Sequence, residues 1–131
     1  MAKLTSEAKA MFRRQLAIVA TTASDGTPNV GPKGSMNVVD DETLAYSENT
    51  CEKTFKNLKE NPKMAVMVVD WDKADGFQIK GTTQLMTNGN FFEKVARMQE
   101  ERKRPRPIYV VRVRIEEIYS LKPGSSGYES E

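Results

Sequence analysis

The sequence predicts a mainly β protein, an antiparallel barrel of about six strands with short flanking helices. Three features indicate this: a tight-turn signal at Asp25-Gly26, long stretches in which apolar and polar residues alternate, and one helical crossover between strands. Strands joined by hairpin turns are antiparallel, whereas a doubly wound parallel sheet needs a helix after nearly every strand. The 131 residues fit one domain, which can bury about two-thirds of the surface of its unfolded chain.

The first third of the chain predicts a helix and a β-hairpin. Apolar residues at helical spacing indicate a helix from Thr5 to Leu16, with Thr5 or Ser6 as its N-cap. Small and β-branched residues from Leu16 to Ala23 indicate a buried strand. Ser24-Asp25-Gly26-Thr27 follows as the hairpin turn, because glycine readily takes the positive φ that a tight turn needs. The partner strand runs from Asn29 to Val39 and is interrupted by glycine and proline.

The rest of the chain predicts four more strands and two more helices. Pro62 and Pro105 end the two helices, because proline cannot continue the hydrogen-bond ladder. The Gly- and Ser-rich residues 124–131 are expected to be disordered, which leaves residues 1–123 as the folded domain. The predicted strands are Thr43–Ser47, Lys63–Trp71, Phe77–Met86 and Ile108–Leu121, and the predicted helices are Glu52–Glu60 and Phe91–Arg102.

The composition excludes several kinds of catalytic site. The chain has no histidine and a single cysteine, Cys51, so a Ser-His-Asp or Cys-His triad, a two-histidine zinc site and a histidine base are excluded. Asp40-Asp41 lies in a short polar turn without a third ligand nearby in sequence, which favours a solvated turn over a metal site. Redox or group-transfer chemistry would therefore have to come from a cofactor.

Charge and hydropathy indicate a cytoplasmic protein without a nucleic-acid or membrane partner. A single cysteine cannot form an intramolecular disulfide, the N-terminus has no signal-peptide pattern, and the longest apolar run, Met64 to Val69, is too short to cross a bilayer. The net charge of +2 implies no strongly anionic partner. The charge run from Glu100 to Arg106 is more typical of a solvated helix end than of a nucleic-acid site, because two glutamates accompany its basic residues.

The segment from Asn49 to Thr54 has the composition of an anion-binding helix start. Asn49 with Glu52 three residues on matches a capping box, and Thr50 is an alternative cap. Lys53 then falls in the first helical turn, where the helix dipole disfavours a cation unless an anion binds beside it. Backbone N–H groups, the hydroxyls of Thr50 and Thr54 and the Lys53 ammonium would together bind a phosphate. The alternative is that Lys53 simply points into solvent.

A second candidate ligand surface is the interrupted strand, at Pro32, Lys33, Gly34 and Ser35. Glycine has no side chain, so the backbone N–H and C=O groups can meet a flat or anionic ligand directly. Proline removes one donor of the strand ladder, which a central strand does not normally tolerate. A ligand pressed against this strand would explain both residue types.

The elements and motifs, in this order, resemble the FMN-binding split-barrel proteins of the pyridoxamine 5'-phosphate oxidase-like superfamily, and among them the small single-domain members. The resemblance covers nearly the whole chain, from about Leu4 to Pro123. It implies a six-stranded antiparallel split β-barrel. The motifs that carry it are Asp25-Gly26-Thr27-Pro28, Pro32-Lys33-Gly34-Ser35, Lys53-Thr54, Glu60-Asn61-Pro62 and Gly76-Phe77-Gln78-Ile79-Lys80-Gly81.

The resemblance implies non-covalent FMN as the cofactor. The FMN phosphate would lie on Lys53 and Thr54, with Asn49 and Thr50 in the loop before them. The ribityl chain and the edge of the ring would lie along the strand at residues 32–35. Family members are typically homodimers with flavin at the subunit interface, which the polar face of the predicted strand at residues 77–86 would allow.

Two departures from the family argue against pyridoxamine 5'-phosphate oxidation. Those oxidases use an arginine and a lysine on the first flavin strand and an Arg-x-His pair near the C-terminus, whereas Gly31 and Met36 fall near the strand positions here and histidine is absent. We expect an oxidoreductase that passes hydride or electrons through FMN to a small-molecule substrate or redox partner, with no catalytic side chain assigned. The alternatives are a non-catalytic electron carrier, flavin store or redox sensor, and a deazaflavin in place of FMN. Haem is disfavoured because no histidine is available as an axial ligand.

Overall fold

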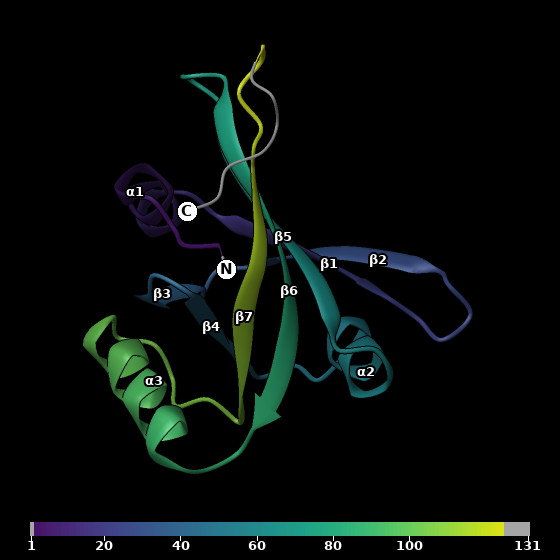
Figure 1. Cartoon of the computed structure of the whole chain (residues 1–131). Helices are drawn as coiled ribbons and strands as arrows, with labels where there is room; N and C mark the ends of the chain where they lie inside the picture. The colour runs from purple at the N-terminus through teal and green to yellow at the C-terminus, as the bar shows by residue number, and fades with distance from the viewer. Residues whose placement is uncertain (1, 125–131) are drawn as a thin grey trace.

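The computed structural model describes residues 2–124, in which seven antiparallel strands form one sheet in the order β2-β1-β5-β6-β7-β4-β3. Figure 1 shows the long strands β5, β6 and β7 in the middle, with the β1–β2 hairpin and the β3–β4 hairpin leading away from them. The predicted antiparallel split-barrel fold is confirmed; residues 125–131 of the predicted disordered tail lie outside the described range. The strands are β1 Ala17–Thr22, β2 Pro28–Lys33, β3 Asn37–Asp40, β4 Thr43–Glu48, β5 Lys63–Asp70, β6 Asp75–Met86 and β7 Tyr109–Ser120.

The predicted count of six strands was wrong, because the segment from Asn29 to Val39 forms two strands. β2 ends at Lys33, and the chain then turns, with the Met36 N–H donating to the Lys33 carbonyl at 3.2 Å. β2 and β3 lie at opposite edges of the sheet. An edge strand has one side without ladder partners, so the edge position is enough to accommodate Pro32.

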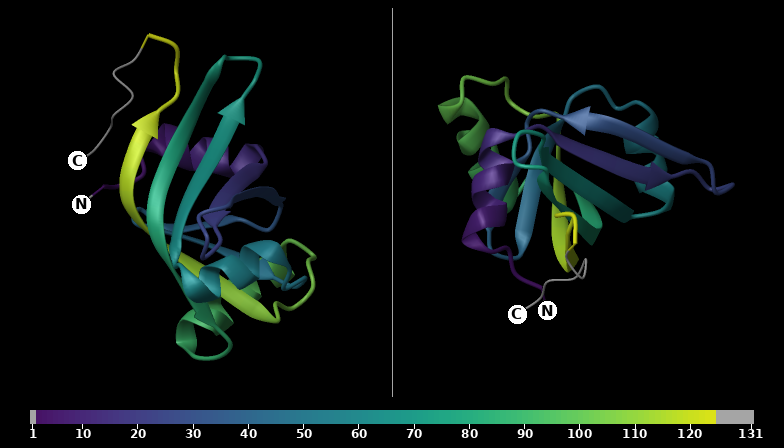
Figure 2. Two further views of the ribbon diagram at one scale, coloured as in Figure 1. Left: turned by 90° about the vertical axis from the view of Figure 1, so that its right-hand side faces the viewer. Right: turned by 90° about the horizontal axis from the view of Figure 1, so that it is seen from above.

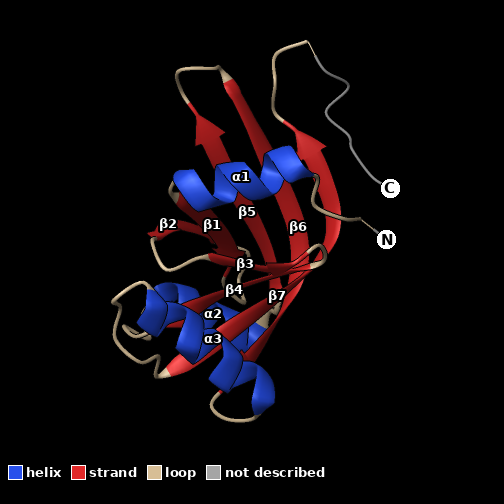
Figure 3. Ribbon diagram, turned by 90° about the vertical axis from the view of Figure 1, so that its left-hand side faces the viewer, coloured by secondary structure: helices blue, strands red, loops and turns tan. Residues whose placement is uncertain are grey.

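Within the described residues, three helices cover the sheet, α1 Ser6–Arg14, α2 Lys53–Glu60 and α3 Asn90–Glu101. Helix α1 packs across β3, β5 and β6, α2 packs against β1 and β2, and α3 packs against β4 and β7 (Figures 2 and 3). The predicted cap of α1 is confirmed, since the Thr5 hydroxyl oxygen accepts the Ala8 N–H at 3.1 Å. No helix in residues 2–124 is long and apolar enough to span a membrane.

Two apolar clusters hold these layers together. The larger one lies between α1 and the sheet and includes the buried side chains of Phe12 and Ile79. The smaller one lies under α3, where Phe92 and Val95 pack on Val110 of β7. Each fully buried side chain of this size contributes about 1.5–3 kcal/mol relative to an exposed one, so the two clusters fix where α1 and α3 sit on the sheet.

The long β6–β7 pair curves at a bulge. Gly81 pairs with Ile115 and its neighbour Lys80 with Glu117, which leaves Glu116 as the extra residue of β7. A Cβ atom on Gly81 would overlap the Arg114 carbonyl oxygen, so glycine is required for the two backbones to approach here.

Candidate functional site

The structure brings the predicted site residues into one region. Pro32 and Lys33 end β2, Gly34 and Ser35 lie in the turn that follows, and Lys53 and Thr54 begin α2, which packs against β2. Asn49 and Thr50 lie in the loop between β4 and α2. The residue that joins these segments is one that sequence reasoning missed, Glu48, the last residue of β4.

Glu48 is a buried carboxylate, with an exposed fraction of 1%. Its Oε1 accepts a hydrogen bond from Lys33 Nζ at 3.0 Å, and its Oε2 accepts from the Thr50 hydroxyl at 3.0 Å, the Thr50 N–H at 3.2 Å and the Cys51 N–H at 3.1 Å. Burial alone would raise the pKa of Glu48, but the hydrogen bonds from Lys33, Cys51 and Thr50 and the Lys33 charge outweigh it and hold the pKa below its ordinary value. Lys33 and Thr50 are therefore engaged by the protein's own anion.

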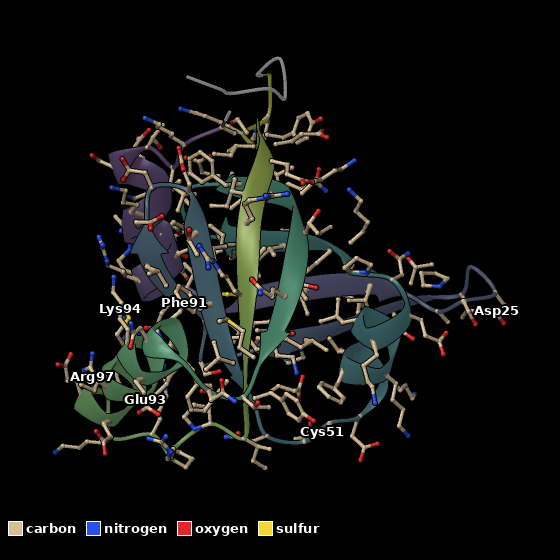
Figure 4. The ribbon with its side chains drawn as sticks, turned by 60° about the horizontal axis from the view of Figure 1, so that its bottom comes forward. Asp25, Cys51, Phe91, Glu93, Lys94 and Arg97 are labelled. Atoms are coloured by element: carbon tan, nitrogen blue, oxygen red, sulfur yellow. The ribbon has the colours of Figure 1, made fainter. Side chains whose placement is uncertain are left out.

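The loop between β4 and α2 owes its shape to the same carboxylate. Cys51 has a φ of 55°, in the left-handed region that is uncommon for residues other than glycine. Its N–H donates to Glu48, and the Asn49 side chain accepts the Ile108 N–H at 2.8 Å, which ties the loop to the start of β7. Figure 4 marks Cys51 in this loop. The sequence signal was a lone acidic residue at the end of an apolar strand, directly before a polar loop; its burial could not be inferred from spacing.

The predicted capping box of α2 was wrong. Asn49 and Thr50 are bonded elsewhere, and the N-cap is Glu52, whose side chain makes no cap hydrogen bond. The intrahelical ladder begins with the Lys56 N–H donating to the Glu52 carbonyl at 2.9 Å. The N–H groups of the three residues before Lys56 thus lie ahead of the ladder, and no acidic residue occupies the first turn.

Lys53 and Thr54 lie at this open helix start, as predicted from the sequence. Lys53 is exposed and has no hydrogen bond or ion pair with any of the described residues. Thr54 is buried, and its hydroxyl oxygen accepts from Asn29 Nδ2 at 3.1 Å, so its own proton remains available to donate. Asn57 donates to the Thr21 hydroxyl at 3.1 Å and holds α2 on β1. N–H groups at a helix start, a lysine and a hydroxyl are the donor types that oxyanion sites in proteins use.

The predicted flavin strand is only partly open. Gly34 has room for close approach, since the nearest atom to a Cβ built on it would be Leu16 Cδ1 at 4.0 Å, and Pro32 is exposed. Ser35 is used structurally instead, because its hydroxyl accepts the Ser47 N–H at 3.0 Å and donates to the Ser47 carbonyl at 3.3 Å. Of the four predicted residues, Pro32 and Gly34 face open space, while Lys33 and Ser35 are bonded within the chain.

Three buried polar atoms of β3 and β4 have no partner in the described part of the chain. Within the described residues, Asn37 Oδ1, the Tyr46 hydroxyl and the Ser47 hydroxyl have no hydrogen-bond partner. Burial, and secondarily the negative charge of Glu48, raises the pKa of Tyr46, and Lys33 Nζ lies 5.2 Å from the centre of the Tyr46 ring. Buried polar atoms of this kind commonly take an ordered water molecule as their partner.

Comparison with known proteins points to one family. The family model described as pyridoxamine 5'-phosphate oxidase matches residues 4–122. An uncharacterized protein of Methanocaldococcus jannaschii, MJ0282, is 33% identical over 126 residues, which are 93% of this chain and 83% of that protein. HupZ of Group A Streptococcus is 34% identical in its crystal structure, with a TM-score of 0.88 over 98% of this chain and 99% of that one.

A more distant solved structure shows the same fold. It is an FMN-binding protein from Syntrophomonas wolfei, 20% identical, with a TM-score of 0.73 over 86% of this chain and 82% of that chain. The family model covers nearly the whole chain, and two relatives exceed 30% identity over almost its full length. The chain belongs to the pyridoxamine 5'-phosphate oxidase-like superfamily of FMN-binding split-barrel proteins.

Proposed function

We propose that this protein binds FMN non-covalently and acts as an oxidoreductase that passes hydride or electrons to a small molecule or a redox partner. The observation that carries the proposal is the start of α2. There, the N–H groups ahead of the ladder lie beside the exposed Lys53 and the Thr54 hydroxyl, the Glu52 side chain makes no cap hydrogen bond, and the first turn holds no acidic residue. A phosphate at this point would be stabilised by the helix dipole and would pair with Lys53. Membership of the family and the fold shared with an FMN-binding protein support the same ligand.

The side chains have different roles in this proposal. Lys53 and Thr54 would hold the phosphate, and the bare backbone near Pro32 and Gly34 would lie along the ring edge. Four other predicted residues would not touch the flavin but would hold the turn and the loop in place through hydrogen bonds to Glu48, Ser47 and Ile108. These residues are Lys33, Ser35, Asn49 and Thr50. FMN supplies hydride and one-electron chemistry when bound, while the protein would hold the flavin in position and limit its access to solvent.

A second copy of the chain is the partner that we propose for the outer face of β1, β2 and β5. This face exposes large apolar side chains, with exposed fractions of 68% for Val30, 37% for Met67 and 38% for Val69. Val30 is paired with Ala20, and Ile18 with Met67, so these side chains form one continuous surface across three strands. Contiguous apolar surface of this kind marks an interface. Sedimentation of the purified chain tests the homodimer, and a monomer at micromolar concentration would contradict it.

The flavin proposal is tested by titrating FMN into the protein and its variants. Lys53→Ala should weaken FMN binding by about 1.5–3 kcal/mol, because it removes a charge-assisted hydrogen bond to phosphate. Lys56→Ala is the matched control: it removes an exposed lysine of the same helix beyond the first turn and should leave the affinity unchanged. Flavin absorbance bands that persist through gel filtration support the cofactor class, and equal affinities of the two variants would remove Lys53 from the site.

A non-catalytic flavin carrier, store or sensor is the second candidate. One observation favours it: Lys33 and Glu48, the titratable pair nearest the proposed ring strand, are bonded to each other, so neither is free as an acid or base. Turnover of reduced nicotinamide with common electron acceptors separates the two candidates. Steady-state turnover supports the oxidoreductase, whereas reduction of bound flavin without turnover supports the carrier.

A further inference from the structure

A groove lined by basic side chains lies between the end of α1, the β2–β3 turn and the segment that follows α3. Its volume is about 210 Å³, and none of the described residues that line it is acidic. Two of its basic side chains come from the end of α1, one from the end of β2 and two from beyond α3, so the groove exists only in the folded chain. The five cations are Arg13, Arg14, Lys33, Arg102 and Arg104.

The charge of this groove is only partly compensated. Arg14 reaches Asp70 at 3.4 Å, and Lys33 pairs with Glu48 at 3.0 Å. Within residues 2–124, no carboxylate lies within ion-pair distance of the other three side chains, Arg13, Arg102 and Arg104. Three of the arginines that line this groove thus have no ion-pair partner among the described residues.

Arg104 is held in the groove by a buried side chain. Gln99 has an exposed fraction of 0%; its Oε1 accepts from Arg104 Nη1 at 3.2 Å, and its Nε2 donates to the Ser35 carbonyl at 2.9 Å. The amide therefore connects the β2–β3 turn to the guanidinium and sets its direction. Burial, and then repulsion by Arg102, lowers the pKa of Arg104, because the guanidinium has lost part of its water and lies near a second positive charge.

We propose that this groove binds a small molecule through an oxyanion group, either a phosphate or a set of carboxylates. Arg104 would donate to the oxyanion from its fixed position, and Arg13 and Arg102 would close over it from the two sides. Gly34 lines the same groove without a side chain and leaves room for the ligand beside the turn. Planar guanidinium groups suit both chemistries because they donate two parallel hydrogen bonds to phosphate or carboxylate oxygens.

The groove is separate from the start of α2, although Gly34 also belongs to the segment that we propose for the flavin ring edge. The two sites use different cations, Lys53 at the helix and the three unpaired arginines at the groove. The small volume and the neighbouring Glu100 and Glu101 fit a compact ligand better than a polynucleotide, which needs an extended basic surface.

Calorimetric titration of the full chain with pyrophosphate and with citrate tests this inference. We expect one probe to bind and its affinity to fall as salt is added, because the groove is open to solvent. Arg104→Gln should weaken binding about tenfold or more, the loss expected for one charge-assisted hydrogen bond. Arg97→Gln is the matched control, since it removes the same charge from an exposed position of α3 outside the groove (Figure 4). The tighter probe shows whether phosphate or carboxylate is preferred.

Three results would overturn the proposal: no binding of either probe, equal loss in Arg104→Gln and Arg97→Gln, or displacement of the probe by FMN. Displacement would mean that the groove is part of the flavin site, so a separate anion site would fail while flavin binding stood. If Arg104→Gln lowers the melting temperature, the double variant Arg13→Gln, Arg102→Gln replaces it. Both of those residues are exposed and take part in no ion pair within the described chain, so their removal should weaken the probe without unfolding the protein.

Discussion

Helices α1 and α2 begin in opposite ways. The start of helix α1 is stabilised by side chains of the protein itself: the Thr5 hydroxyl caps it, and Glu7 places a negative charge in the first turn. Helix α2 has Glu52 at its N-cap without a cap hydrogen bond, and Lys53 places a positive charge where the dipole is already positive. The chain thus caps one helix start with its own side chain and leaves the other with a cation in its first turn and no cap hydrogen bond, which is a pattern expected where a ligand completes the structure.

The missing cap alone does not mark the site, as α3 demonstrates. Its N-cap is Gly89, which has no side chain to offer, but Glu93 lies in its first turn and pairs with Arg106 at 2.7 Å. Uncapped helix starts are therefore tolerated in this fold when an acidic residue is present. What separates α2 from both other helices is the sign of the charge in its first turn.

The largest effect should come from the residue that shapes the approach to α2. Glu48→Ala should lower the free energy of unfolding by about 3 kcal/mol, because it leaves Lys33 without its partner and the Thr50 and Cys51 N–H groups without an acceptor. Glu52→Ala should change it by less than about 0.5 kcal/mol, since Glu52 is exposed and caps nothing. Urea unfolding of both variants measures the difference, and similar losses would contradict the role of Glu48.

The same carboxylate should make stability depend on pH in a predictable direction. The pKa of Glu48 is lower in the folded protein than in the unfolded chain, so its contribution is fully present above the unfolded value and is lost as the pH falls through the folded one. The stability difference between the natural protein and Glu48→Gln should therefore shrink from pH 7 toward acid. Urea unfolding at several pH values tests this, and a constant difference would mean that Glu48 is not ionised in the folded state.

Removing the cap of α1 should have a smaller effect. Thr5→Ala leaves the Ala8 N–H without its acceptor and should cost about 1 kcal/mol of unfolding free energy. Affinity for FMN should not change, because α1 packs across β3, β5 and β6 rather than beside α2. Thermal melts and flavin titration of one preparation give both quantities. A loss of flavin affinity would mean that the two helix starts are coupled.

The smallest expected change in stability comes from reversing the charge in the first turn of α2, and it tests the contrast between the two helices most directly. Lys53→Glu gives α2 the acidic first turn that α1 already has, so the ligand-free protein should gain about 0.3–1 kcal/mol in stability. The same change should abolish FMN binding, because a carboxylate would face the phosphate. Urea unfolding without ligand and flavin titration measure the opposite outcomes. A variant that is less stable than the natural protein would show that Lys53 makes a structural contact.

Most local features of the fold follow from short stretches of sequence. Gly26 takes a φ of 90° in the predicted hairpin turn, Thr5 caps α1, and Lys53 falls in the first turn of α2. Each depends on chemistry within a few residues, so spacing was sufficient. The caps assigned to Asn49 and Thr50 were wrong for the opposite reason: their hydrogen-bond partners are Ile108, distant in sequence, and Glu48, whose burial depends on packing.

The sequence by itself determined the mainly antiparallel fold, the helices and the position of Lys53 in the first turn of α2, because periodicity, turn residues and caps act locally. Only the tertiary structure decided that the segment from Asn29 to Val39 forms two strands at opposite edges of the sheet. It also decided that Glu48 is buried against Lys33. It also decided that arginines from α1 and from beyond α3 meet in one groove. Burial and long-range charge depend on which segments the packed core brings together, and that information is distributed over the whole chain.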